Sequence, residues 1–202
     1  YQQEVLTINN GVDVQRFYVA DEAPNLRLPD CFVTVMVAGF REAKDQDTLI
    51  RAIASLPNQY QLWLVGDGVR RGALEAVIAS EGVAHRVKLL GIRSDVPQVL
   101  KAADVVVMSS HWEGLSLSNI EGMSSGRPFI ASDVDGLREV TKGYGVLFPH
   151  EDAEALAAII RKLHDDKAYY DEVAEKCYQR AMMFDIEKMV DGYESVYKEL
   201  VP

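Results

Sequence analysis

The sequence is short of cysteine, of positive charge and of long apolar runs. Its 202 residues include two cysteines, Cys31 and Cys177, which show no metal or redox spacing. Lysine and arginine number 21 against 31 aspartates and glutamates, and the net charge of -10 argues against nucleic-acid binding, which depends on positive charge. No apolar run approaches the roughly 20 residues of a transmembrane helix, and no signal-peptide pattern opens the chain. We therefore expect a cytoplasmic protein with no nucleic-acid partner and no transmembrane segment.

What is present is an ordinary globular composition, with 48% apolar and 26% charged residues. The length suits one large domain, or one domain with extensions. An acidic chain can still bind a small anion, because a local site can be positive. The first residue is Tyr1 rather than Met, so we expect a piece of a longer protein.

Six short apolar runs alternate with helical patterns along the chain. The runs show little strict alternation of apolar and polar residues, which is typical of strands covered on both faces. Between the first two runs, Leu49, Ile53 and Leu56 share one helical face. This rhythm predicts an α/β fold: a doubly wound, Rossmann-like parallel sheet of about six strands, with extra C-terminal helices. The expected strands lie at 33–38, 62–65, 87–90, 105–108, 129–131 and 146–148.

Two helix starts carry capping residues. Ser94 and Asp95 precede a helix that tolerates Pro97 in its first turn. Asp152 precedes a helix that is expected to run to about residue 164. Because serine and aspartate oxygens accept hydrogen bonds from the first free amides of a helix, we expect both helices to begin after these residues.

Three parts are expected along the chain. Residues 1–30 are predicted to be a connector, with a short strand at 5–8, and residues 31–184 to be the Rossmann-like domain. Residues 185–202 are predicted to be a helix, because apolar residues recur on one face between 189 and 200. We expect part of that face to be exposed and to pack on a domain that this chain lacks.

Several strands are followed by a small residue. In an open parallel sheet, ligands bind beyond the carboxyl ends of the strands, where small residues let the backbone turn and approach a ligand. Five small residues at one edge favour a binding site there. They are Gly39, Gly66, Gly91, Ser109 and Ser132.

The stretch 109–121 follows an apolar strand and opens a helix. Free amides at a helix start bind anions, and the helix dipole adds to this attraction. Glu113 and Glu121 are poor phosphate ligands but good acceptors for sugar hydroxyls. Lys44 is expected at the same sheet edge, where its charge would neutralise a diphosphate. A capped surface helix with incidental acids fits the spacing equally well.

Other motifs are weaker. A dinucleotide fingerprint is suggested by Gly66, Gly68 and Gly72, but the third glycine comes one place late. The acidic loop 133–139 could close the same crevice or be a plain surface loop. The histidines show no metal-ligand spacing, although one of them adjoins Glu113. They are His85, His111, His150 and His164.

The ordered set of motifs resembles the C-terminal, donor-binding half of a family 4 glycosyltransferase with the GT-B fold. The resemblance runs through most of the chain, and its hallmark is the pair of glutamates, Glu113 and Glu121, with seven residues between them. The other matching segments are 10–13, 44–52, 64–68, 90–96, 103–105, 114–115, 122–123, 126–128 and 136–139.

The resemblance implies a role for each matching residue. Glu121 would accept hydrogen bonds from the ribose of a nucleotide diphosphate-sugar, and Glu113 from the transferred sugar. Lys44 would balance the negative charge of the departing diphosphate. Glu113 and Lys44 would thus be catalytic residues. The backbone of Gly114, Leu115 and Ser116 would lie near the sugar and phosphates, and the base near Gly91, Ile92 and Arg93.

One position departs from the family pattern. The family commonly has an arginine five residues before the lysine, where this chain has Gly39. Arg41 is the nearby cation that could substitute for it as a catalytic residue.

The resemblance also implies properties of a whole enzyme. It would retain anomeric configuration, need no metal and no cofactor beyond the nucleotide-sugar, and serve the synthesis of a cell-envelope polysaccharide. Its acceptor would bind to an N-terminal domain of the same protein, and peripheral membrane contact stays open. Two alternatives remain: an NADP-binding oxidoreductase domain using Arg93, and a non-catalytic nucleotide-sugar-binding module, suggested by Gly39.

Overall fold

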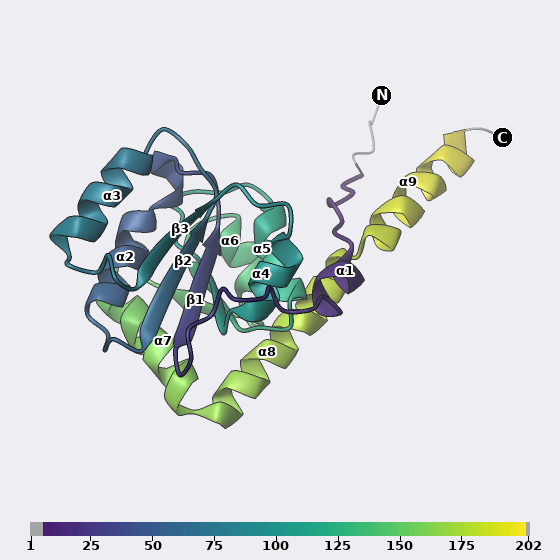
Figure 1. Ribbon diagram of the computed structural model, residues 1–202. Coiled ribbons are helices and arrows are strands. Elements are labelled where there is room, and N and C mark those ends of the chain that lie inside the picture. The colour runs from purple at the N-terminus through teal and green to yellow at the C-terminus, as the bar shows by residue number, and fades with distance from the viewer. Residues whose placement is uncertain (1–5, 201–202) are drawn as a thin grey trace.

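Six parallel strands form the centre of the fold in the computed structural model, which describes residues 6–200 (Figure 1). The expected parallel sheet is confirmed, and each strand lies within two residues of its predicted position. The strands run in the order β3-β2-β1-β4-β5-β6. They are β1 (Phe32–Val37), β2 (Tyr60–Val65), β3 (Val87–Gly91), β4 (Val105–Met108), β5 (Phe129–Ser132) and β6 (Val146–Phe148).

The strands form because they can be covered on both faces. All six residues of β2 and all four of β4 are buried, which a strand with alternating polar residues could not tolerate. The order of the strands reverses between β1 and β4, so the loops after these two strands lead to opposite sides. Such a switch point leaves a crevice at the carboxyl ends of the two strands.

Helices cover both faces of the sheet. Figure 1 shows α2 and α3 on one side of the strands and α4 and α5 on the other. This arrangement follows from right-handed crossovers, because the chain moves outward from β1 in one direction and from β4 in the other. The helices are α2 (Gln46–Ala54), α3 (Arg71–Ser80), α4 (Val96–Ala102), α5 (Leu117–Ser124), α6 (Leu137–Thr141), α7 (Ala153–Asp165) and α8 (Lys167–Ala181), with 3-10 turns η1 (Glu42–Lys44) and η2 (Met182–Phe184).

The predicted caps have different outcomes. Asp152 caps α7, since its Oδ1 accepts from the Ala155 amide at 2.8 Å. Asp95 occupies the N-cap position of α4 but makes no capping hydrogen bond, so that part of the prediction is wrong. Its carboxylate is instead held by Arg93, whose Nε donates to Oδ1 at 2.8 Å.

The N-terminal segment differs from its prediction. Residues 6–8 form no strand, so the predicted strand at 5–8 is wrong where the structure describes it, and Val5 lies outside the described residues. The segment also contains a helix that was not predicted, α1 (Val14–Tyr18), which packs against α4 and α5. Asp13 caps it, and Val14 and Phe17 are buried. Residues 1–30 therefore contribute to the core as well as connecting.

The last helix, α9 (Ile186–Leu200), has no buried residue. Tyr193 and Tyr197 are 45% and 64% exposed, which confirms that part of the apolar face is open. Figure 1 shows α9 leaving the body of the protein beside the N-terminal segment. The two are joined where the Gly11 amide donates to Met189 Sδ at 3.3 Å. Packing of α9 on a further domain stays a prediction.

No helix within residues 6–200 is both long and apolar enough to cross a membrane.

Candidate functional site at the switch point

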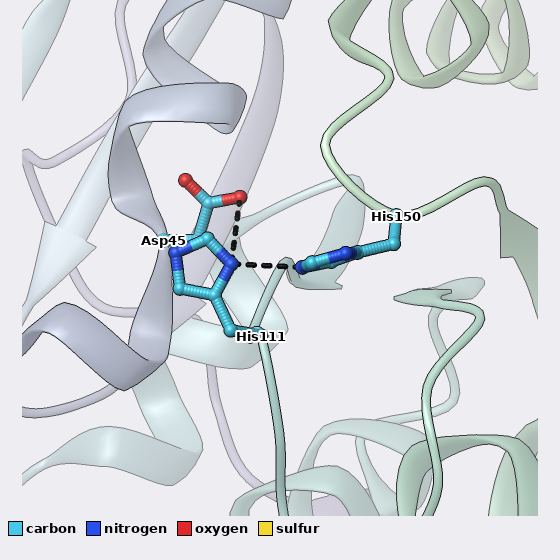
Figure 2. Close-up of side chains that lie close together, drawn as sticks. All are labelled: Asp45, His111 and His150. Carbon is cyan, nitrogen blue, oxygen red and sulfur yellow. Dashed lines mark hydrogen bonds and ion pairs between the residues drawn. The ribbon is translucent and has the colours of Figure 1, made fainter.

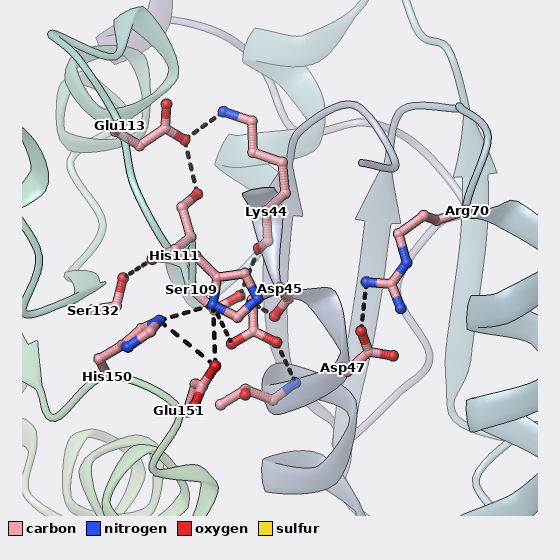
Figure 3. Close-up of polar contacts among 12 residues, drawn as sticks. Lys44, Asp45, Asp47, Arg70, Ser109, His111, Glu113, Ser132, His150 and Glu151 are labelled. Atoms are coloured by element: carbon pink, nitrogen blue, oxygen red, sulfur yellow. Dashed lines mark hydrogen bonds and ion pairs between the residues drawn. The ribbon is translucent and has the colours of Figure 1, made fainter. Parts of the chain in front are cut away.

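Lys44 and Glu113 form an ion pair across the switch point between β1 and β4 (Figure 3). Lys44 ends η1, after β1, and Glu113 lies in the loop after β4, so the prediction that they share one sheet edge is confirmed. Ser110 Oγ donates to the same carboxylate oxygen, Oε1, at 2.7 Å. The pair is mostly sheltered, with side chains 23% and 10% exposed, so its attraction is screened less than at an open surface. An ammonium has three donors, and the bond to Glu113 leaves two for other acceptors.

Buried serines at the strand ends hold the neighbouring loops together. Ser109 Oγ donates to the Asp45 carbonyl at 2.7 Å, and Ser132 Oγ to the Ser110 carbonyl at 2.6 Å. The backbone adds a bond from the His111 amide to the Ala43 carbonyl at 2.8 Å. Ser109 and the His111 amide therefore fix the loop that carries Glu113 against the loop that carries Lys44, and Ser132 ties the Glu113 loop to the end of β5.

The glycines after β2 also serve packing. A Cβ on Gly68 would fall 2.5 Å from the Phe40 carbonyl oxygen, and one on Gly66 would overlap the Ala38 carbonyl. Gly66 in addition has φ +136°, which disfavours any side chain. The absence of side chains lets the loop after β2 lie directly on the loop after β1. This packing accounts for the two glycines without a bound dinucleotide.

A cavity of about 340 Å³ opens at the carboxyl ends of β1, β2 and β3. The predicted donor-binding residues Gly39, Ile92 and Arg93 line it, and Ser118 reaches it from α5. The neighbouring Gly91 has φ +69°, so it makes the turn that brings Ile92 and Arg93 to the cavity. Its size and mixed lining are those of a small-molecule site.

Glu121 lies one helical turn beyond Ser118, on the same face of α5. Its carboxyl is half-buried, and this burial raises its pKa, an effect that the charge of Arg16 opposes. Arg16 belongs to α1, which packs against α5. The unpredicted helix thus supplies the charge that faces Glu121. A capping aspartate followed by Val14 and Phe17 is the sequence signal that could have revealed it.

The start of α5 has free backbone amides, because Ser116 stands at the N-cap and makes no side-chain cap. The loop before it, which includes Gly114, Leu115 and Ser116, leads from Glu113 to these amides. Gly136 of the acidic loop 133–139 packs on the Glu113 and Gly114 carbonyls, so the two loops lie against each other. Closure of the crevice by this acidic loop stays a prediction.

Arg41 lies close to the position where the family pattern places an arginine. Its Nε is 3.8 Å from the point that a Cβ on Gly39 would occupy. The end of the Arg41 side chain therefore lies beside the point from which a side chain at position 39 would start.

Two clusters were not predicted. Arg70 pairs with Asp47 at 2.7 Å, which ties the loop after β2 to α2 (Figure 3). Asp45, His111 and His150 gather beside the loops after β1, β4 and β6 (Figure 2). The histidine pair has a sequence signal, because both residues follow strands whose carboxyl ends share one edge of the sheet.

Residues 31–166 match the family model described as Glycosyl transferases group 1. The chain belongs to this family. It is 31% identical to the lipopolysaccharide core biosynthesis glycosyltransferase LpsE of Rhizobium meliloti, over 96% of this chain and 57% of that protein. It is 28% identical to the UDP-Gal:alpha-D-GlcNAc-diphosphoundecaprenol alpha-1,3-galactosyltransferase of Escherichia coli, over 98% of this chain and 55% of that protein.

Among solved structures, the group 1 glycosyltransferase fold is matched by Alr3699/HepE of Anabaena in complex with UDP. The TM-score is 0.87 at 26% identity, over 95% of this chain and 57% of that one. The chain thus spans about half the length of the curated relatives that it matches.

Family membership removes the oxidoreductase alternative, and the geometry agrees. Arg93, the proposed partner of a 2′-phosphate, is already engaged by Asp95. Gly66 and Gly68 pack on the chain itself rather than framing a pyrophosphate.

Proposed function

We propose that this chain is the donor-binding part of a glycosyltransferase and binds a nucleoside diphosphate-sugar at the switch point. The observation that carries the proposal is the Lys44–Glu113 ion pair beside the cavity that Ser118 lines, with Glu121 one turn along α5. The combination provides a cation for phosphates, carboxylates for hydroxyls and a cavity for a base within one crevice.

Each group has a distinct task in this proposal. The base and ribose lie in the cavity lined by Ile92 and Arg93, and Glu121 accepts hydrogen bonds from the ribose hydroxyls. The diphosphate faces Lys44 and the free amides of α5, since opposite charge and aligned N–H groups both favour an anion there. Glu113 accepts hydrogen bonds from hydroxyls of the sugar.

Transfer breaks the bond between the anomeric carbon and the diphosphate oxygen. A bond from that carbon to an acceptor hydroxyl oxygen forms, and the hydroxyl proton passes to an oxygen of the departing diphosphate. Negative charge then accumulates on the departing diphosphate. Lys44, Arg41 and the start of α5 would stabilise that charge without a metal at the phosphates. We include retention of the anomeric configuration in the proposal, as the family resemblance implies.

A further domain is part of the proposal, because the chain spans about half of its relatives. That domain would bind the acceptor, a growing cell-envelope polysaccharide, so this chain alone would bind the donor without transferring sugar. On this chain, the surface that contacts the further domain would include the exposed face of α9.

UDP is the first ligand to test, because a relative of similar fold was solved with UDP bound and another is named for UDP-galactose. We expect calorimetry to find one UDP per chain. Glu121→Gln should weaken binding about ten- to a hundredfold, the equivalent of ~1.5–3 kcal/mol for a hydrogen bond to a charged group.

Glu175→Gln is the matched control, because Glu175 is an exposed glutamate on α8 that does not line the cavity. It should bind UDP as the unmodified chain does. The proposal fails if neither UDP nor GDP, ADP, CDP or dTDP binds, or if Glu121→Gln and Glu175→Gln have equal affinity.

The non-catalytic alternative rests on Gly39. Arg41 lies close enough to take over the missing cation, which favours an active enzyme. Transfer of sugar from the bound donor by the full-length protein would exclude the non-catalytic module, and its absence with every donor that binds would support it.

A further inference from the structure

Asp45, His111 and His150 converge from three loops, and their ligand atoms lie within 4.8 Å of one another (Figure 2). His111 Nδ1 is 2.8 Å from His150 Nε2 and 3.9 Å from Asp45 Oδ2. We propose that these residues bind a divalent transition-metal ion, with zinc the best match to the donor set. Two imidazole nitrogens and a carboxylate oxygen suit zinc, cobalt or nickel, whereas magnesium and calcium favour oxygen ligands.

The distances fit a tetrahedral ion. Zinc bonds of about 2.0–2.2 Å place neighbouring ligand atoms about 3.3–3.6 Å apart, because a tetrahedron's edge is about 1.6 times its centre-to-corner distance. The separations of 2.8 and 3.9 Å bracket that range. Glu151 Oε1, 3.4 Å from His111 Nδ1 and 4.0 Å from His150 Nε2, provides a fourth ligand. The His150 and Glu151 side chains are 37% and 62% exposed, so they have room to move toward an ion held by Asp45 and His111.

Asp45 gives the independent observation. Its side chain is buried, with the residue 4% exposed, and its Oδ2 has no hydrogen-bond partner among the described residues. The other oxygen, Oδ1, is used to cap α2 through the Thr48 amide at 3.2 Å. An unpartnered buried carboxylate oxygen is costly, and Oδ2 faces His111 at a distance that is too long for a hydrogen bond. A metal ion would satisfy it.

A hydrogen bond between the two imidazoles is the alternative to a metal. It would pair one N–H with one lone pair and so explain the 2.8 Å separation. It would leave Asp45 Oδ2 unpaired, however, and give no role to Glu151. The metal accounts for all four groups at once.

The surrounding loops are already held in place. The His111 amide donates to the Ala43 carbonyl, and Ser109 Oγ to the Asp45 carbonyl, so ordering the site for an ion costs little further entropy. Figure 3 shows the cluster at one end of this network and the Lys44–Glu113 pair at the other. The ion would therefore be structural, joining the loops after β1, β4 and β6 without touching the diphosphate. It is independent of the proposed function.

Cobalt is the probe of choice, because tetrahedral Co²⁺ absorbs visible light strongly while octahedral aqueous Co²⁺ does not. The chain, free of any histidine tag, is first dialysed against a chelator and then titrated with Co²⁺. We expect the tetrahedral spectrum to saturate at one ion per chain and zinc to abolish it. Zinc should also raise the melting temperature, since it binds the folded chain alone.

Two variants remove ligands and one is the control. His150→Gln and Asp45→Asn should each weaken metal binding at least about tenfold, and Asn still caps α2 and tolerates the left-handed backbone at position 45 (φ +45°). His85→Gln, which changes an exposed histidine paired with Asn58, should bind as the unmodified chain does.

The proposal is overturned if the unmodified chain binds neither Co²⁺ nor Zn²⁺ at micromolar concentrations. It is equally overturned if His150→Gln and His85→Gln bind alike. Should Asp45→Asn fail to fold, His150→Gln decides the matter, because the His150 side chain is 37% exposed and carries little of the core.

Discussion

The backbone of Gly136 packs on the peptide that follows Glu113, so close that a Cβ on Gly136 would fall 2.6 Å from the Gly114 carbonyl oxygen. Gly136→Ala should therefore push the loop between β4 and α5 away and misplace Glu113. We expect UDP affinity to fall about tenfold or more, equivalent to ~1.4 kcal/mol, as measured by calorimetry.

Gly143→Ala provides the control for this change. Gly143 has nearly the same φ, +84° against +80°, but a Cβ there would meet nothing within 4 Å. Both variants should lose stability in urea unfolding by about 1–2 kcal/mol from the left-handed backbone alone. Equal UDP affinity in the two variants would contradict the contact between Gly136 and the site.

Lys44→Gln should weaken UDP binding, whereas Glu113→Gln should not. Without Lys44, the Glu113 carboxylate is left unpaired beside the diphosphate, so we expect UDP affinity to drop about ten- to a hundredfold. Glu113→Gln frees the ammonium and should leave UDP affinity equal or higher. It should instead abolish the difference in affinity between UDP and UDP-glucose, because that difference depends on the sugar hydroxyls. A loss of UDP affinity in Glu113→Gln would argue against this arrangement.

The sheet could be predicted because each strand is an apolar run of its own. All of 105–108 and 146–148 was placed correctly, and β1 and β2 differ from the prediction only at their ends. Helix α1 has no such run, since its five residues offer only two buried positions, Val14 and Phe17, and the capping Asp13 is its main sequence signal. Its stability comes from packing on α4 and α5, and such tertiary contacts are absent from local sequence.

The candidate site, too, could be predicted from the sequence only in part. Lys44 and Glu113 could be assigned to one crevice because parallel strands place all their carboxyl ends at one edge. The sequence could also place His111 and His150 at that edge. Their contact with each other and with Asp45 could not be predicted, because it depends on loop paths set by bonds such as that from the His111 amide to Ala43. Likewise, Asp95 was predicted as a cap, but its pairing with Arg93 took precedence.

Glu121 should make opposite contributions to stability and to binding. Burial raises the pKa of this carboxyl above its ordinary 4.5, so the folded chain holds the proton more tightly than the unfolded chain does. Its stabilising contribution is therefore present below pH 4.5 and is lost as the pH rises through the shifted value. At pH 7 Glu121→Gln should unfold at a higher temperature than the unmodified chain, although it binds UDP more weakly.

The pH dependence of uridine binding should also reveal the protonation of Glu121. Uridine has no phosphate to titrate at acidic pH, so a fall in its affinity on acidification reports Glu121 taking up a proton. This fall should begin above the ordinary glutamate range and be missing in Glu121→Gln. A fall of the same size in that variant would assign the titration to another group.

Cys31 and Cys177 should differ in reactivity. Both are free thiols, but burial raises the pKa of Cys177 to about 12. At pH 8 only about one Cys177 in 10,000 would be a thiolate, the reactive form. A disulfide reagent such as dithionitrobenzoate should therefore titrate one thiol in the folded chain and two in urea. Two rapid equivalents in the folded chain would show that Cys177 is accessible.

Arg41 should be replaceable by an arginine at position 39. Arg41→Ala is expected to weaken UDP binding, because it removes a cation from the crevice, while Arg161→Ala on the exposed side of α7 should not. Gly39 tolerates a side chain, since its φ lies outside the left-handed region and a Cβ there would meet nothing closer than 3.8 Å. Gly39→Arg introduced into Arg41→Ala should therefore fold normally and restore most of the lost affinity. If Gly39→Arg folds but restores nothing, as calorimetry would reveal, then a side chain at position 39 does not bring its cation to the diphosphate. Unchanged UDP affinity in Arg41→Ala itself would show that Arg41 has no part in balancing the charge of the diphosphate.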